Sequence, residues 1–74
     1  MTRRPVTRHP VVEALKGRRL ALELSQRDVA ARVDGLRQAE ISAWETGRMQ
    51  PTLANIDRWA SALGCEIVVV EAEG

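Results

Sequence analysis

The segment from 25 to 47, SQRDVAARVDGLRQAEISAWETG, constrains this 74-residue chain more than any other. Apolar residues recur there at helical spacing on both sides of Asp34-Gly35, a dipeptide that favours a turn because glycine adopts positive φ without steric cost. Two short amphipathic helices joined by a tight turn are therefore predicted, and Ser25 with Asp28 fits a capping box at the start of the first. The second, from about 37 to 46, is expected to bury Ile41 and Trp44 and to present its polar first turn to the outside.

Three further elements are expected around this helix pair. A helix from about 10 to 23 begins at Pro10, which the first turn of a helix tolerates. Another helix follows Thr52, its N-cap, and ends before Gly64. Its expected buried stripe consists of Leu53, Ile56, Trp59, Ala60 and Leu63. The β-branched segment from 65 to 72, CEIVVVEA, predicts a strand. The expected fold is all-α, a compact four-helix domain with a short C-terminal β-strand.

Size and composition exclude several classes of protein. The chain makes one domain, whose core contributes only roughly 3–5 kcal/mol of stability, so a partner or a ligand is expected to supplement it. One cysteine and one histidine provide no internal disulfide and no metal site. No catalytic constellation indicates an enzyme or a cofactor. No segment is apolar enough to cross a membrane or to direct export, so the reducing cytoplasm is the expected location.

The net charge of +1 is unevenly distributed. Residues 1–50 carry ten Lys or Arg against six Asp or Glu, whereas residues 51–74 carry one Arg against four acids. Random scatter of charge would explain this pattern. Alternatively, the basic residues of the segment 1–50, which we call the basic front, predict an anionic partner for that segment alone. We divide the chain into a flexible basic arm at 1–9, a helical domain at 10–64 and a tail at 65–74.

The paired helices of the central segment match a helix-turn-helix, in which the second helix enters the major groove of DNA. Further pieces of sequence stand around them in a fixed order. They are Arg19 with Leu24-Ser25-Gln26, Val29-Ala30, Ile41-Ser42-x-Trp44-Glu45-x-Gly47, Pro51-Thr52 and Ala60-x-Ala62-Leu63-Gly64. Together these pieces resemble the phage repressor and Cro-type helix-turn-helix family of bacterial and phage regulators, over about 15 to 64.

The resemblance implies a DNA interface. Gln26 would lie against a phosphate and steady Gln38, the first base-reading residue, while Ala39 would offer a methyl group to thymine. The expected DNA-contacting residues are Gln26, Arg27, Arg37, Gln38, Ala39, Ser42, Ala43, Arg48 and Thr52. Within this set, Ala43 is a second methyl group facing the bases, and Arg48 and Thr52 contact the phosphate backbone.

The sequence departs from the family pattern in three places. The stretch from Ala30 to Ile41 is one residue longer than usual, which alters the expected docking angle of the second helix. Arg37 stands where a Ser or Thr cap is common, and its charge could reach a phosphate or a guanine. Glu40 would be unfavourable near phosphates unless it accepts from cytosine or pairs with an arginine. The C-terminal strand also replaces the further helix of many relatives.

Several residues allow a structural and a functional interpretation. Trp44 and Trp59 could stack on bases, but both follow apolar stripes, so core packing is expected. Arg19 and Glu45 could be separate surface charges, but the resemblance favours a buried ion pair between them. His9 has no companion ligand and is treated as incidental.

The tail segment Ile67, Val68, Val69 and Val70 has two expected fates. It folds back over the helices, or it pairs with its copy across a twofold axis, and we favour the second. The resulting prediction is a sequence-specific, double-stranded DNA-binding regulator, a repressor that binds a palindromic operator as a homodimer. The alternatives are an antitoxin that also regulates its own operon, and a protein-interaction module without DNA binding. A toxin or RNA polymerase would be the protein partner.

Overall fold

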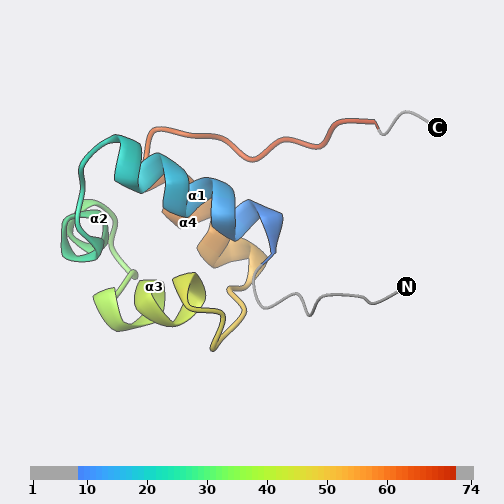
Figure 1. The fold of residues 1–74 in the computed structure, drawn as a ribbon. Coiled ribbons are helices and arrows are strands. Elements are labelled where there is room, and N and C mark those ends of the chain that lie inside the picture. The colour runs from blue at the N-terminus through green and yellow to red at the C-terminus, as the bar shows by residue number, and fades with distance from the viewer. Residues whose placement is uncertain (1–8, 72–74) are drawn as a thin grey trace.

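The structure, a computed structural model, describes residues 9–71 and forms four helices in this range. They are α1 (Pro10–Ala21), α2 (Gln26–Arg32), α3 (Gln38–Glu45) and α4 (Leu53–Ala62). Helices α1 and α4 pack together, and α2 and α3 close one side of the pair (Figure 1). The all-α prediction is confirmed for these residues. Most of the expected basic arm, 1–8, and the end of the expected strand lie outside the described residues.

Two helix starts use the caps that the sequence predicts. The Ser25 hydroxyl accepts a hydrogen bond from the Asp28 amide at 2.9 Å, and the Asp28 carboxylate accepts one from the Ser25 amide at 2.9 Å. The Thr52 hydroxyl accepts one from the amide of Asn55 at 3.1 Å. Each side chain therefore satisfies an amide of the first turn that has no partner within its helix.

His9 is not incidental, and the sequence interpretation of this residue was wrong. Its Nδ1 atom accepts a hydrogen bond from the amide of Val11 at 3.1 Å, which makes His9 the N-cap of α1. Pro10 then occupies the first helical position, where its missing amide hydrogen leaves no acceptor unpaired.

Three of the four helices end in the same backbone arrangement, a left-handed residue followed by a returning amide. Gly47 takes this position after α3 with a φ of 82°, and Gly64 takes it after α4 with a φ of 72°. After α1 the position belongs to Glu23, with a φ of 58°. A non-glycine residue in this region costs roughly 1–2 kcal/mol. Because Glu23 leaves the helical conformation, α1 ends at Ala21, two residues before the predicted end.

The core is built around two tryptophans. Trp44 and Trp59 are 2% and 0% exposed, and their ring centroids lie 5.5 Å apart at 37°. This confirms core packing over base stacking. Leu36, in the loop before α3, is also buried, although no periodic pattern predicted it. Leu53 was expected on the buried stripe of α4, but it is 75% exposed because it opens the helix beyond the residues that α1 covers.

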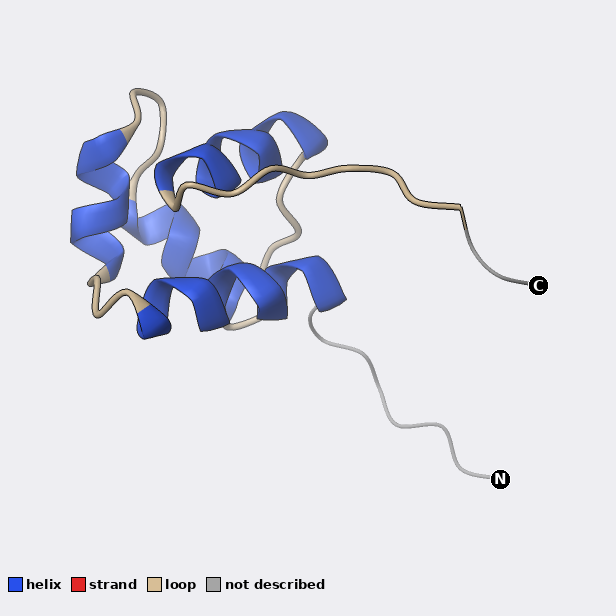
Figure 2. Ribbon diagram, turned by 90° about the horizontal axis from the view of Figure 1, so that it is seen from above, coloured by secondary structure: helices blue, strands red, loops and turns tan. Residues whose placement is uncertain are grey.

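The tail leaves α4 and runs past α1 as a loop, on the side of the molecule away from α3 (Figures 1 and 2). No strand occurs among residues 9–71, so the strand expected from 65 to 72 is not formed by the single chain. Ile67 lies near the helices, whereas Val69 is 99% exposed. Because a strand needs a neighbour for its amides and carbonyls, pairing with a second copy stays a prediction.

Candidate nucleic-acid interface

Helices α2 and α3 are joined by a short turn at Val33–Arg37. Gly35 has a φ of 92°, which a residue with a side chain rarely adopts. Buried Leu36 fixes the end of this turn against the core. Helix α3 then follows the lower edge of the molecule, so one of its faces is free of other elements (Figure 1).

A buried ion pair connects α1 to α3. The Nε and Nη2 atoms of Arg19 donate to the two carboxylate oxygens of Glu45, each at 2.8 Å, and the third donor, Nη1, bonds the Leu24 carbonyl at 2.7 Å. Glu45 is 2% exposed. The hydrogen bonds that Arg19 donates to Glu45 are the main cause that raises the pKa of Arg19 above its ordinary value. The predicted ion pair is confirmed, and its bidentate geometry fixes the direction of α3.

Gln26 extends this network to α2. Its side-chain Nε2 donates to Glu45 at 3.0 Å, so the first residue of α2 is tied to the last residue of α3. The resemblance implied that Gln26 steadies Gln38, and the observed bond goes to Glu45 instead. A phosphate contact by the Gln26 carbonyl oxygen stays a prediction.

The outer face of α3 is polar and open. Arg37, Gln38 and Ala39 are exposed, and Ser42 is half-buried. Arg37 is the N-cap residue but makes no side-chain capping bond, so its guanidinium is not committed to the helix start. Glu40 is half-buried on the same helix. These residues form the surface that we call the α3 outer face: Arg37, Gln38, Ala39, Glu40 and Ser42.

Ala43 does not belong to the α3 outer face, and its predicted exposure was wrong. The residue is 5% exposed. The chain turns back after α3, and the amides of Arg48 and Met49 bond the Ala43 carbonyl at 2.9 and 3.2 Å. This turn lies over Ala43, so its methyl group has no access to a base edge.

The remaining predicted DNA contacts flank α3. Arg27, Arg48 and Thr52 are all exposed. Arg48 Nε bonds the hydroxyl of Thr46 at 3.3 Å, which orients its guanidinium beside the end of α3. Thr52 caps a ten-residue helix, so the amides of the first α4 turn are oriented for an anion.

Two arginines that contribute to the basic front serve the fold instead. Arg18 Nε donates to the carbonyl of Leu63 at 3.3 Å, and Arg32 Nη1 donates to the carbonyl of Ala62 at 3.2 Å. Both therefore bind the negative end of α4. Charge counting cannot separate such residues from DNA-binding arginines, since the distinction depends on tertiary position.

The class of protein is defined by a match to a family model. A family model described as Helix-turn-helix matches residues 15–70. This match covers most of the chain, and the protein belongs to the helix-turn-helix family. Members are DNA-binding transcription regulators, generally without enzymatic activity. Comparisons with curated proteins and with solved structures gave no match.

The described residues contain neither a membrane-spanning helix nor a metal-binding group of side chains. None of the helices between residues 9 and 71 is both long and apolar enough to span a bilayer. The same residues contain no group of three His, Cys, Asp or Glu side chains placed to hold a metal ion.

Proposed function

We propose that the protein is a sequence-specific regulator that binds a palindromic double-stranded operator as a homodimer and represses transcription. In this proposal α3 enters the major groove, and the bound dimer excludes RNA polymerase from the promoter. Two copies on a twofold axis would present their α3 helices roughly 34 Å apart, one turn of DNA.

The observation that carries the proposal is the contrast between the two faces of α3. Its inner side chains, Ile41 and Trp44, are 0% and 2% exposed, whereas Gln38 and Ala39 are exposed. The tail, which could have covered this surface, leaves on the other side of the molecule (Figure 1). Helix α3 is thus held rigidly from behind and is open in front, as a groove-reading helix must be.

Base recognition is assigned to the first turn of α3. A glutamine at the start of a reading helix bonds adenine through both its amide atoms, worth roughly 1–3 kcal/mol of discrimination. We assign this role to Gln38 and methyl contact with thymine to Ala39. Arg37 supplies a bond to a guanine or a phosphate, Glu40 would accept from cytosine, and Ser42 lies within reach of either kind of group.

Backbone contacts are assigned to the flanking residues. Arg27 and Arg48 bring charge to the phosphates on either side of the groove, and Thr52 brings the amides of the α4 start. Gln26, the first residue of α2, is also assigned a contact with a phosphate. These contacts carry no sequence information, so they should contribute equally on every duplex.

The experiment compares Gln38→Ala with the unchanged protein on a selected operator and on random duplex DNA. We expect Gln38→Ala to lose roughly 10-fold or more of the preference between the two DNAs, with little loss on random DNA. Ser61→Ala is the control, because Ser61 is an exposed polar residue of α4 and lies outside α3. Equal losses on both DNAs would contradict base reading by Gln38.

A second function is favoured by one specific observation. Val68 and Val70 are 65% and 78% exposed, an apolar surface that suits a protein partner. In an antitoxin, this tail would mask a toxin while α3 regulates the operon. A neighbouring gene whose product binds the tail with high affinity would support this alternative. A module that binds only proteins would show no steep fall in duplex binding as salt rises.

A further inference from the structure

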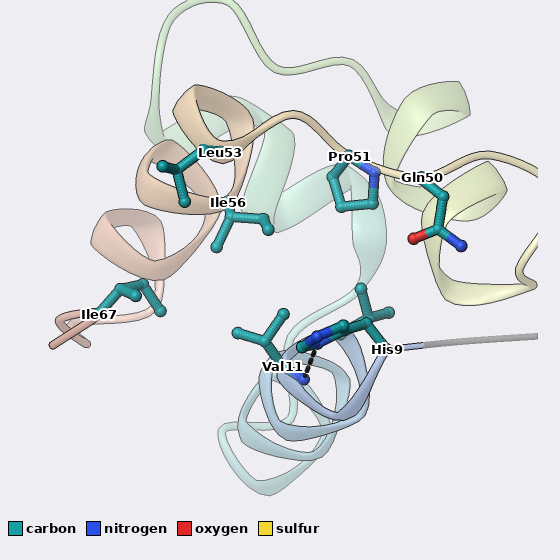
Figure 3. Close-up of a pocket in the computed structure, with 8 residues that line it drawn as sticks. His9, Val11, Gln50, Pro51, Leu53, Ile56 and Ile67 are labelled. Carbon is teal, nitrogen blue, oxygen red and sulfur yellow. Dashed lines mark hydrogen bonds between the residues drawn. The ribbon is translucent and has the colours of Figure 1, made fainter. Parts of the chain in front are cut away.

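An apolar groove opens between the starts of α1 and α4. Its volume is about 330 Å³. Figure 3 shows Leu53 and Ile56 of α4 on one side of the space, Val11 of α1 on the other, and Ile67 of the tail at its edge. The volume corresponds to roughly ten water molecules at about 30 Å³ each, and apolar walls offer them few hydrogen bonds. An apolar occupant would therefore be favoured over water.

The tail carries apolar side chains that are exposed in the single chain, Val69 almost fully and Ile67 to 39%. Ile67 and Val69 line one open hollow together with Leu53, so they share the face that looks toward α4. Val68 and Val70 belong to the opposite face, because side chains alternate along an extended chain. Val69 is 99% exposed, so the tail does not fill the space beside its own α4.

We propose that the groove binds the tail of a second copy of the chain, with the two tails paired antiparallel and Val68 lying on the twofold axis. The proposal rests on the homodimer of the proposed function and defines its interface. Residues directly opposite each other in an antiparallel pair point to the same face. With Val68 facing its own copy, Ile67 of one chain lies opposite Val69 of the other, and both face the groove.

The occupant is a second copy because groove and tail are complementary within one sequence. Each chain supplies one empty groove and one unpacked tail, so a twofold arrangement satisfies both without another partner. The positive ends of α1 and α4 open at the groove, and Glu71, on the same face of the tail as Ile67 and Val69, supplies a negative charge that such ends favour. A twofold axis perpendicular to the paired tails also keeps both α3 helices on the same side, facing one duplex.

The first test measures self-association of the full chain by sedimentation equilibrium. Val69→Asp and Leu53→Ser each change the interface twice per dimer, and we expect each to weaken dimerisation by roughly 100-fold or more. Leu20→Ser is the matched control, since Leu20 is 55% exposed on α1 outside the groove lining. The exposure of Val69 and Leu53 predicts unchanged thermal unfolding of the monomer. A dimer that neither substitution weakens would overturn the proposal.

The second test fixes the arrangement by disulfide formation in a Cys65→Ser background. Val68→Cys should cross-link to its own copy, because opposite residues of paired strands lie roughly 4.5–5.5 Å apart at Cα, within disulfide range. Mixed chains carrying Leu53→Cys and Val69→Cys, distinguished by mass, should form a mixed disulfide. An intrachain disulfide in monomeric Leu53→Cys/Val69→Cys would show that the tail occupies its own groove, and would overturn the proposal.

The two proposals fail separately. If the unchanged chain stays monomeric at high concentration and still prefers a selected duplex through Gln38, the groove proposal is overturned and DNA reading stands. If the chain forms the cross-linked dimer but binds no duplex in dilute salt, the groove proposal is supported and DNA reading fails.

Discussion

The end of the molecule that contains α2 and α3 differs from the side that carries the groove and the tail in how far its side chains are covered by their own chain. At the first, a charged pair with 2.8 Å bonds is buried within one chain, and each neighbouring helix contributes to it. At the second, leucine and valine side chains face solvent across an open hollow. The first region is complete in a single chain, and the second is not. The stability of the single chain should therefore depend mainly on the first region, and assembly on the second.

The largest expected effect is in the complete region. Glu45→Ala leaves Arg19 buried without its carboxylate and removes the acceptor of Gln26, a change that costs roughly 3–5 kcal/mol. In a domain of this size the melting temperature should fall by more than about 10 °C in thermal unfolding followed by circular dichroism. Glu66→Ala, at an exposed tail residue on the face away from the groove, is the control and should change little. A fall of only one or two degrees after Glu45→Ala would contradict the account of this network.

A smaller effect of opposite sign is expected between the two regions, at the end of α1. Glu23→Gly relieves a left-handed conformation at a φ of 58° and should stabilise the chain by about 1 kcal/mol. Denaturant unfolding would show a higher midpoint with an unchanged slope. Glu13→Gly, in the first turn of the same helix, should instead destabilise the chain. A lower midpoint for Glu23→Gly would show that its side chain makes a stabilising contact.

The smallest effect concerns pH. The amide of Ser25 bonds the Asp28 carboxylate, and this bond holds the pKa of Asp28 below its ordinary value. The capping contribution is therefore fully present above about pH 4 and is lost as the pH falls through the lowered pKa of the folded state.

The measurement is the difference in melting temperature between the unchanged chain and Asp28→Asn. The asparagine keeps an oxygen acceptor but cannot titrate. The difference should be constant from neutral pH to about pH 5 and should shrink toward lower pH. A difference that grows on acidification would show that the folded pKa lies above the unfolded one, contrary to this account.

The sequence predicted those features that depend on neighbours along the chain. The capping box at Ser25 and the cap at Thr52 are local patterns, and the helical period located Ile41, Trp44 and Trp59 in the core. The ion pair of Arg19 with Glu45 required the family resemblance, because its members lie 26 residues apart.

Features that depend on which elements of the fold bury a side chain were predicted wrongly or missed. Ala43 lies on the polar side of α3 in a helical projection, but the following turn buries it. Leu53 fits the apolar stripe of α4, yet no element of its own chain covers it. The capping role of His9 and the left-handed backbone of Glu23 were missed because neither residue is of a type that usually occupies such a position. The tail could not be placed because the described residues contain no strand with which it could pair.

The most direct test of the central claim follows backbone amides by NMR while a selected operator duplex is added at low salt. The account predicts the largest changes at Arg37, Gln38 and Ala39 and at Arg48, with the tail at 67–70 unchanged once the dimer has formed. Changes confined to the tail, or no change at α3 at any duplex concentration, would contradict DNA reading by the α3 outer face.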